Sequence, residues 1–357
     1  MTHPNRNYGC RISDDWQLKG MKTVVMENEL LRITILADKG SDIYEFLYKP
    51  LDIDFMWRRP GELRNPNRGL PTNATENGPF MDFYEGCWQE ILPSGGPANV
   101  HNGIPYGQHG EVCNLPWRCE ILNDSPEEIS CKFSVRAIRT PVRVEKTLTL
   151  KRGNPALFIE EKLFNECPEK LDFMWGHHLT FGEPFLDEHC RIDTPASEIY
   201  IHPVEYSKNH RFHPAKKYPF PFAKNRDGKD EDFRVIPPKS RKSEDMTYFL
   251  DLKEPWFALT HTQKQVGFAL RWTGDVFRYL WYWQVFNGGQ GYPWFSNTYN
   301  IGLEPWTSLP TSGLSDVVKQ KTHLVLPPNG QISASMTAAI YTGLSEVNHV
   351  SINGKVS

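Results

Sequence analysis

The sequence lacks the features that mark several large classes of protein. The chain has 357 residues, and none of its apolar runs approaches the ~20 residues needed to cross a bilayer, so we expect no membrane partner. Lys plus Arg number 40 and Asp plus Glu number 43, which gives a net charge of −3. Because proteins that bind nucleic acid through its phosphates carry a large excess of positive charge, this balance argues against a nucleic-acid partner.

Cysteine is scarce and irregularly spaced. The seven cysteines are an odd number, and none forms a Cys-x-x-Cys pair, so the sequence signals neither a complete disulfide framework nor a zinc ribbon. Residues 1–15 are polar and lack the apolar core of a signal peptide. These features predict a cytoplasmic protein with reduced thiols.

The motifs of the common cofactor-dependent and nucleophilic enzymes are also absent. The chain has no phosphate-binding glycine-rich loop, dinucleotide fingerprint, Gly-x-Ser-x-Gly elbow or His-Glu-x-x-His zinc motif. Cys113 is close to His109 in the sequence, but no third orienting group accompanies them, as a thiol nucleophile would need. We therefore expect no cofactor and no metal ion.

Aromatic side chains and turn residues are abundant. The chain holds 20 Phe, 14 Tyr and 11 Trp, together with 26 Gly and 28 Pro. The aromatic residues exclude a disordered chain, and the prolines disfavour a helical bundle. The composition is typical of a compact protein rich in turns.

Alternating apolar and polar residues predict strands along most of the chain. Residues 31–36 alternate and end at a turn, with 43–48 as the expected hairpin partner. Residues 130–136, 142–150 and 156–164 are separated by short polar turns, which favours antiparallel pairing because parallel strands need long crossovers. Further strands are expected at 257–262, 267–272, 279–286, 321–326 and 332–341.

The same pattern predicts one domain. Length alone would accommodate two domains, but the meander of strands without long helices favours a single large antiparallel β domain. We expect an N-terminal extension at 1–20, the catalytic domain at 21–345 and a C-terminal tail at 346–357. Two segments rich in proline, 58–79 and 206–241, are expected to be long surface loops.

Histidines are densest in residues 175–182. Adjacent residues of a strand point to opposite faces, so at most one of His177 and His178 enters a given cleft, and a structural pair within a turn is the alternative. His109 is flanked by glycines, which allow the backbone to approach a ligand closely, although a turn histidine explains the pattern equally well.

Glu304 lies in an apolar and aromatic segment directly before Pro305, which holds it extended. Carboxylates in such surroundings have raised pKa values and suit general acid–base chemistry. The alternative is a buried glutamate that accepts hydrogen bonds from backbone donors. Several tryptophans fall near these segments, where their rings would stack on sugars or simply fill the core.

Taken in order, these segments resemble the galactose mutarotase-like superfamily, in its aldose 1-epimerase-like branch. The resemblance covers roughly residues 20–345 and implies an all-β fold, an antiparallel β-supersandwich in a single large domain. It also implies cofactor-free interconversion of the α and β anomers of a free sugar. The residues that carry it lie in 26–33, 40–43, 53–58, 109–117, 174–182, 280–284 and 302–306.

The resemblance implies roles for individual residues. Glu304 matches the general base that takes the anomeric proton, His178 matches the acid that protonates the ring oxygen, and His109 matches a histidine that polarises the substrate. Other polar and aromatic residues near these segments are expected to contact the sugar. They are His177, Gln284, Trp175, Trp306, Arg59 and Arg68.

The chain also departs from the pattern of galactose mutarotases, in residues 64–68 and 177–180. Galactose is therefore not implied, and Arg58, Arg59 and Arg68 suggest a modified or anionic sugar, with ordinary loop arginines as the alternative. We expect a small sugar as the partner and a monomer or homodimer. Two other hypotheses compete: a non-catalytic sugar-binding or sensing protein on the same fold, and a lyase or glycoside-cleaving enzyme.

Overall fold

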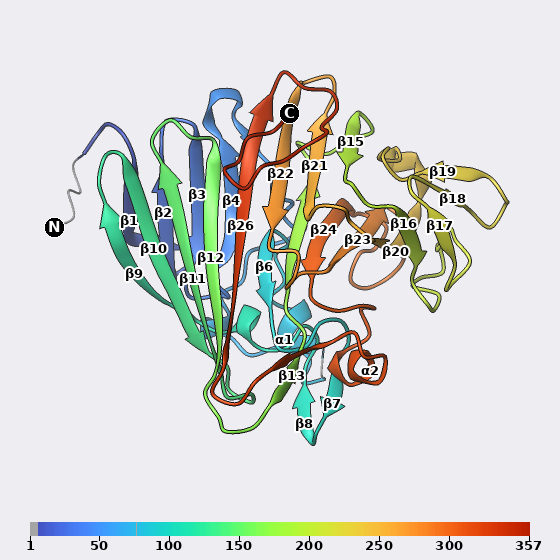
Figure 1. Ribbon diagram of the computed structural model, residues 1–357, viewed down its shortest axis with the longest axis horizontal. Helices are drawn as coiled ribbons and strands as arrows, with labels where there is room; N and C mark the ends of the chain where they lie inside the picture. The colour runs from blue at the N-terminus through green and yellow to red at the C-terminus, as the bar shows by residue number, and fades with distance from the viewer. Residues whose placement is uncertain (1–5, 76) are drawn as a thin grey trace.

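A computed structural model describes residues 6–75 and 77–357, and in it two large antiparallel sheets are stacked face to face (Figure 1). The first sheet has twelve strands, in the order β1-β2-β3-β4-β6-β14-β24-β23-β20-β16-β17 with β5 beside β4. The second has eight, in the order β15-β21-β22-β26-β12-β11-β10-β9. The predicted all-β supersandwich is confirmed.

The strands of the first sheet are β1 (Arg11–Leu18), β2 (Met21–Glu27), β3 (Leu31–Leu36), β4 (Asp42–Tyr48), β5 (Ile53–Asp54), β6 (Trp88–Ile91), β14 (Gly176–Gly182), β16 (Glu198–Ile201), β17 (Lys217–Pro219), β20 (Ser243–Leu250), β23 (Tyr279–Phe286) and β24 (Tyr299–Trp306). Those of the second are β9 (Arg118–Asp124), β10 (Glu128–Arg136), β11 (Val142–Lys151), β12 (Ala156–Asn165), β15 (Cys190–Asp193), β21 (Trp256–His261), β22 (Val266–Trp272) and β26 (Gln331–Thr342).

Short strands, two helices and four 3-10 turns lie outside the two large sheets in the described part of the chain. Three short two-stranded sheets are β7 (Asn99–His101) with β8 (Ile104–Tyr106), β13 (Leu171–Phe173) with β25 (Leu324–Leu326), and β18 (Phe222–Lys224) with β19 (Asp230–Asp232). The helices are α1 (Gly78–Met81) and α2 (Leu314–Lys319), and the 3-10 turns are η1 (Lys49–Leu51), η2 (Pro66–Arg68), η3 (Val112–Asn114) and η4 (Lys239–Arg241). No helix in the described part of the chain is long and apolar enough to cross a membrane.

Alternation along the strands fills the space between the sheets with apolar side chains. In β11 the residues from Val142 to Leu150 alternate between buried and half-buried, and the buried apolar residues join the main core. Aromatic rings pack across the interior, where the ring centroids of Phe46 and Phe268 lie 5.2 Å apart and those of Phe181 and Phe268 lie 5.1 Å apart. Much of the aromatic content therefore fills a wide core.

The expected strand meander is present. β3 pairs with β4, and β10, β11 and β12 form consecutive antiparallel pairs. The expected strand at 321–326 is shorter, since only its last three residues form β25. Residues 206–241, expected to be a surface loop, contain β18 and β19 as well as β17.

The ends of the chain join the sandwich. β1 lies within the segment 1–20 that we expected to be an extension, and it pairs with β2, while residues 1–5 of that segment lie outside the described residues. In the expected C-terminal tail, Val347 and Val350 are buried in a small apolar cluster with Trp256.

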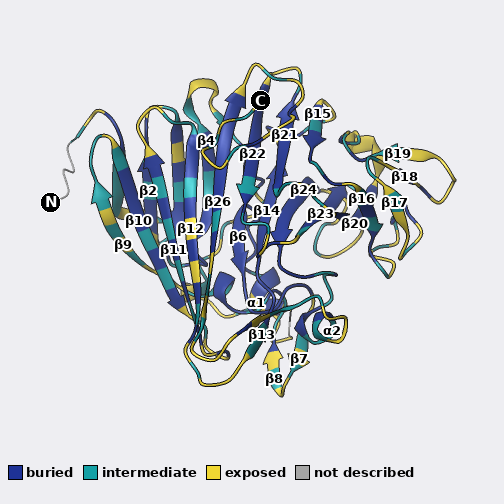
Figure 2. Ribbon diagram, in the orientation of Figure 1, coloured by how far each residue is buried: buried dark blue, intermediate teal, exposed yellow. Residues whose placement is uncertain are grey.

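The central strands of the first sheet are buried on both faces. Every residue of β14 and β24 is buried, and Figure 2 shows these strands in the colour of buried residues while the outlying hairpins are mixed. One face lies against the second sheet. Connecting segments cover the other face, and the candidate site lies beneath them.

Candidate active site

His178 and Glu304 lie next to each other on neighbouring strands of the first sheet. The pairing of Gly176 with Trp306 and of Thr180 with Gly302 places His178 of β14 opposite Glu304 of β24. His178 Nε2 lies 3.8 Å from Glu304 Oε1. Both side chains occupy the face of the sheet that points away from the sandwich interior.

A third histidine approaches from the segment between β8 and η3. The ring centroids of His109 and His178 lie 5.4 Å apart. His109 and Gly110 both have positive φ, 59° and 73°, in a region that residues other than glycine seldom adopt. A Cβ atom at Gly110 would lie 2.5 Å from the carbonyl oxygen of Leu92, so this tight turn, and with it the position of His109, requires the glycine.

Hydrogen bonds fix the His109 segment and its ring. The Glu111 carboxylate accepts from the backbone N–H groups of Ile138 and Arg139, at 2.7 and 2.8 Å, and thereby ties the segment to the turn after β10. The backbone N–H of Gly96 donates to His109 Nδ1 at 3.2 Å. The neutral ring therefore carries its proton on Nε2, and no described residue accepts from this N–H, which leaves it for a ligand.

The three side chains share a cavity of about 70 Å³ with mostly aromatic walls. Apart from His109, His178 and Glu304, its lining consists of Phe80, Met81, Tyr84, Gln108, Tyr206, Met246, Trp281, Trp283, Trp294 and Thr311. Apolar walls with a few convergent polar groups are typical of sites for small molecules. Flat aromatic rings also suit the C–H faces of sugar rings.

Two glycines make room for Glu304 and for the indole that holds it. Trp306 Nε1 donates to Glu304 Oε2 at 3.0 Å, and the Trp306 ring stacks on Trp281 with centroids 3.9 Å apart. A Cβ atom at Gly302 would lie 2.3 Å from Glu304 Oε1, and one at Gly176 would lie 2.1 Å from the Trp306 ring. The carboxyl group is thus oriented with one oxygen on Trp306 and the other toward His178.

Burial sets the protonation of the pair. It raises the pKa of Glu304 to about 8, an effect partly offset by the hydrogen bond from Trp306. Burial lowers the pKa of His178 to about 4. Burial, with a smaller contribution from His178, also lowers the pKa of His109 well below its usual range. At neutral pH the pair therefore holds one proton, on Glu304, and combines one acid with one base.

The structure does not bring His177 into the cavity. Its side chain points between the two sheets, where Nδ1 accepts from Trp88 Nε1 at 3.0 Å and Nε2 lies 3.1 Å from Glu161 Oε2. Trp175 faces the same way and donates from Nε1 to Glu90 Oε1 at 3.0 Å. We expected both residues to contact the sugar, but they lie on the opposite face of the sheet because their positions have the opposite parity to His178.

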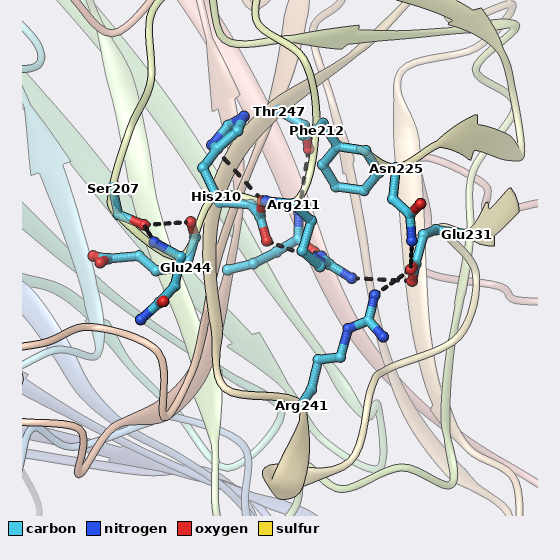
Figure 3. Close-up of polar contacts among 12 residues, drawn as sticks. Ser207, His210, Arg211, Phe212, Asn225, Glu231, Arg241, Glu244 and Thr247 are labelled. Atoms are coloured by element: carbon cyan, nitrogen blue, oxygen red, sulfur yellow. Dashed lines mark hydrogen bonds and ion pairs between the residues drawn. The ribbon is translucent and has the colours of Figure 1, made fainter. Parts of the chain in front are cut away.

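Gln284 also lies outside the cavity. Its Oε1 accepts from Arg211 Nη2 at 2.6 Å and its Nε2 donates to Thr247 Oγ1 at 3.3 Å. Arg211 also bonds Asp245 Oδ2 at 2.6 Å, and Figure 3 shows this arginine at the centre of a polar network that extends to Glu231. Gln284 is therefore part of a structural network on the inner side of β23.

The remaining expected contacts lie around the cavity at different distances from it. Trp306 is beneath the cavity and holds Glu304. Arg59 lines an adjoining groove, donates from Nη1 to the carbonyl oxygen of Met81 at 2.6 Å, and has its guanidinium 5.9 Å from the Trp294 ring centroid. Arg68 belongs to η2, beside Gly20, and lines neither space.

Several walls of the cavity come from segments that strand periodicity does not place. Phe80, Tyr84 and Tyr206 flank the ends of the two long segments that we expected to be loops. Glu244, on β20, lies close by, and burial raises its pKa to about 7, partly offset by a hydrogen bond with Trp294. The one signal for these residues in the sequence is the position of aromatic side chains beside long loops, which often carry binding residues.

The chain was compared with protein families and with proteins of known structure. A family model described as "Domain of unknown function (DUF4432)" matches residues 18–340. No curated protein matches the sequence. A structure from Klebsiella pneumoniae, described as a "putative aldose 1-epimerase", is 17% identical with a TM-score of 0.69, over 93% of this chain and 83% of that one.

Two further structures share the fold. A galactose mutarotase-like protein from Clostridium acetobutylicum is 14% identical, with a TM-score of 0.61, over 94% of this chain and 99% of that one. A galactose 1-epimerase from Lactobacillus acidophilus is 12% identical, with a TM-score of 0.59, over 95% of this chain and 100% of that one. These similarities confirm the galactose mutarotase-like fold that the sequence motifs implied.

Proposed function

The chain belongs to the family described as a domain of unknown function (DUF4432), and we propose that it is an aldose 1-epimerase, which interconverts the α and β anomers of a free sugar. One observation carries the proposal. His178 Nε2 and Glu304 Oε1 lie 3.8 Å apart in a cavity with aromatic walls, and burial moves their pKa values so that the pair holds one proton at neutral pH.

Anomer interconversion requires that a proton is removed from one oxygen and that a proton is delivered to another. Both oxygens are bonded to the anomeric carbon. The anomeric hydroxyl loses its proton as the bond between the anomeric carbon and the ring oxygen breaks, and the ring oxygen gains a proton. The open-chain aldehyde forms, rotates about the bond to the next carbon and closes with both transfers reversed. Because the two oxygens share a carbon, an acid and a base 3.8 Å apart are close enough to contact one each.

In this proposal Glu304 takes the anomeric proton, His178 delivers a proton to the ring oxygen, and His109 donates a hydrogen bond from Nε2 to the sugar. In the empty site burial favours the proton on Glu304. That proton must therefore pass from Glu304 to His178 before the ring opens. After ring opening the proton is on Glu304 and His178 is neutral, so ring closure begins from the distribution that burial favours. Each group therefore acts in both roles within one turnover: Glu304 is the base in ring opening and the acid in ring closure, and His178 is the acid in opening and the base in closure.

The remaining walls would hold the sugar ring. Trp281 and Trp283 alternate on β23 and both face the cavity, with Trp294 across from them. An anionic monosaccharide has less support than a neutral one, because Arg68 lies outside the cavity and Arg59 lies in the adjoining groove.

The test is the rate of mutarotation of a panel of reducing sugars, measured by polarimetry or exchange NMR. The wild type should accelerate at least one sugar over buffer, and Glu304→Gln should lower kcat/KM about 10²–10⁴-fold. Glu188→Gln, at an exposed position, is the matched control and should leave the rate unchanged. No acceleration of any sugar, or full activity in Glu304→Gln, would contradict the proposal. Binding without anomer exchange would instead favour a sugar-binding protein.

A further inference from the structure

The cavity adjoins a long groove on the same face of the first sheet. Met81 and Tyr84 line both the cavity and a neighbouring space of about 380 Å³. Tyr44 and Arg58 in turn line both that space and a third one of about 690 Å³. We call the second and third spaces together the long groove.

The long groove crosses the strands from the site toward the N-terminal edge of the sheet. Its far end is lined by outward-facing residues such as Thr34 of β3, Val25 of β2 and Trp16 of β1. In Figure 1 these strands lie on the left, away from β6 and β24. Five strand spacings separate β14 from β1, so the groove reaches roughly 24 Å from the catalytic pair.

The spaces beside the cavity are large enough for further sugar units. The cavity, at about 70 Å³, is smaller than the ~300–1,000 Å³ of typical ligand pockets. The two spaces of the long groove, about 380 and 690 Å³, both fall in that range. A ligand that seats one end beside His178 and Glu304 therefore has room to continue along the sheet.

Most arginines along the groove are paired with acids, the exceptions among the described residues being Arg59 and Arg64. Arg32 Nη2 lies 2.8 Å from Glu45 Oε1, and Arg11 Nη2 lies 3.0 Å from Glu27 Oε1. Arg58, at the junction of the two spaces, is paired with Asp54. Paired ions carry little net charge, yet they still present directed donors and acceptors. This lining suits neutral hydroxyl groups better than phosphate or a polyanion.

Four aromatic side chains line the groove: Trp16, Tyr44, Tyr84 and Tyr292. Trp16 is 62% exposed on the edge strand β1, and Tyr44 is half-buried with the Arg58 guanidinium 4.5 Å from its ring centroid. A large aromatic ring left in water at a concave surface is typical of a binding site. The exposed Trp16 ring is available to stack on a pyranose ring.

Building on the proposed function, we infer that the substrate is a neutral oligosaccharide with a free reducing end. Its reducing unit lies in the cavity beside His178 and Glu304, and its further units follow the long groove past Tyr44 toward Trp16. The reducing end is the one unit of such a chain that mutarotates, so the groove supplies binding energy without new chemistry.

The experiment measures kcat/KM for mutarotation with neutral glycan series of one to five units, including α- and β-linked glucans, galactans and xylans. In at least one series kcat/KM should rise about tenfold or more from the monosaccharide to the longer chains, which corresponds to about 1.4 kcal/mol. Trp16→Ala should lower the ratio of kcat/KM for the oligosaccharide to that for the monosaccharide. Phe222→Ala removes another exposed aromatic ring, on β18 outside the groove, and should leave the ratio unchanged.

Two outcomes overturn the inference while leaving the epimerase function intact: equal kcat/KM for all chain lengths, or an unchanged ratio in Trp16→Ala. Calorimetric binding of the same glycans separates the two proposals. If a glycan binds and Trp16→Ala weakens it, but no sugar of any length exchanges anomers, the epimerase function fails and the groove stands as a glycan-binding site.

Discussion

His177 and His178 are neighbours on β14, but they face opposite sides of the first sheet and have different surroundings. His177 lies between the sheets with both ring nitrogens engaged, by Trp88 and Glu161. His178 lies in the cavity, where Nδ1 has no hydrogen-bond partner among the described residues and Nε2 is 3.8 Å from Glu304. Both rings are buried, so burial alone does not distinguish them.

The difference between them lies in unmet hydrogen-bonding capacity. A ring whose nitrogens are both engaged must lose those bonds to act on a ligand, at a cost of about 1–3 kcal/mol for each polar group left unsatisfied. A ring buried without partners has its pKa moved by desolvation and remains available. The sandwich therefore places a structural histidine on one face and a reactive one on the other.

The largest expected effect comes from removing the cavity histidine. His178→Gln should lower kcat/KM about 10²–10⁴-fold with an unchanged melting temperature. The double variant His178→Gln with Glu304→Gln should be no more than a few-fold worse than the more impaired single variant, because the two groups share one proton and act as a unit. Polarimetry on the three variants measures this, and losses that simply multiply would contradict the shared-proton account.

The pH dependence of kcat/KM should be bell-shaped. Below a pH of about 4 His178 gains a proton, both groups are protonated and no base remains. Above a pH of about 8 Glu304 loses its proton, and no acid remains. The rate should therefore fall about tenfold per pH unit on each side of a plateau between these values. A rate that keeps rising through pH 9 would show that the single proton held by the pair of His178 and Glu304 is not required.

Gly302→Ala tests whether catalysis depends on the exact position of the Glu304 carboxyl group. The added Cβ would displace the Glu304 carboxyl group, whose Oε1 lies 2.3 Å from that position. A misplacement of about 1 Å costs roughly 10²-fold in rate, whereas a flexible side-chain end moves with little loss of stability. Gly69→Ala, with φ of −160° and no neighbour within 4 Å, is the control and should change neither property. Unchanged kcat/KM in Gly302→Ala would argue against a fixed carboxyl group.

The smallest effect on activity is expected for the interior histidine. His177→Gln should lower the free energy of unfolding by about 1–3 kcal/mol, because the Glu161 carboxylate and the Trp88 indole lose their partner. Its rate per folded molecule should stay within a few-fold of the wild type. His213→Gln, at an exposed position, should stay within about 0.5 kcal/mol of the wild type. Denaturant unfolding measures the stability of both variants.

Periodicity predicted the strands well but could not predict how they align. Residues 279–286 form β23 with the expected bounds, and the alternation of β14 correctly implied that only one of its two histidines enters a cleft. Gln284 was expected at the site because it lies close to aromatic residues in the sequence. The register, which pairs Trp281 with Glu304, instead places the odd-numbered residues of β23 on the cavity face. Register depends on contacts between strands that are distant in the sequence, so the sequence of one strand alone does not determine it.

The cavity walls from loops were harder still to predict. Phe80, Tyr84 and Tyr206 reach the site through irregular segments whose path depends on tertiary packing. The flanking glycines drew attention to His109, with a turn histidine as the alternative, and the close approach of Leu92 requires Gly110. A backbone conformation that requires glycine can be recognised in the sequence, because the glycine itself is visible there. An aromatic side chain on a loop gives little indication that it lines a cavity.

The central claim is that chemistry resides on one face of β14 and stability on the other. Exchange NMR on an equilibrated sugar, with His177→Gln and His178→Gln measured side by side at equal concentrations of folded protein, tests it most directly. The account predicts that anomer exchange in His178→Gln is about 10²-fold or more slower than in His177→Gln. Equal exchange rates in the two variants, or a slower rate in His177→Gln, would contradict it.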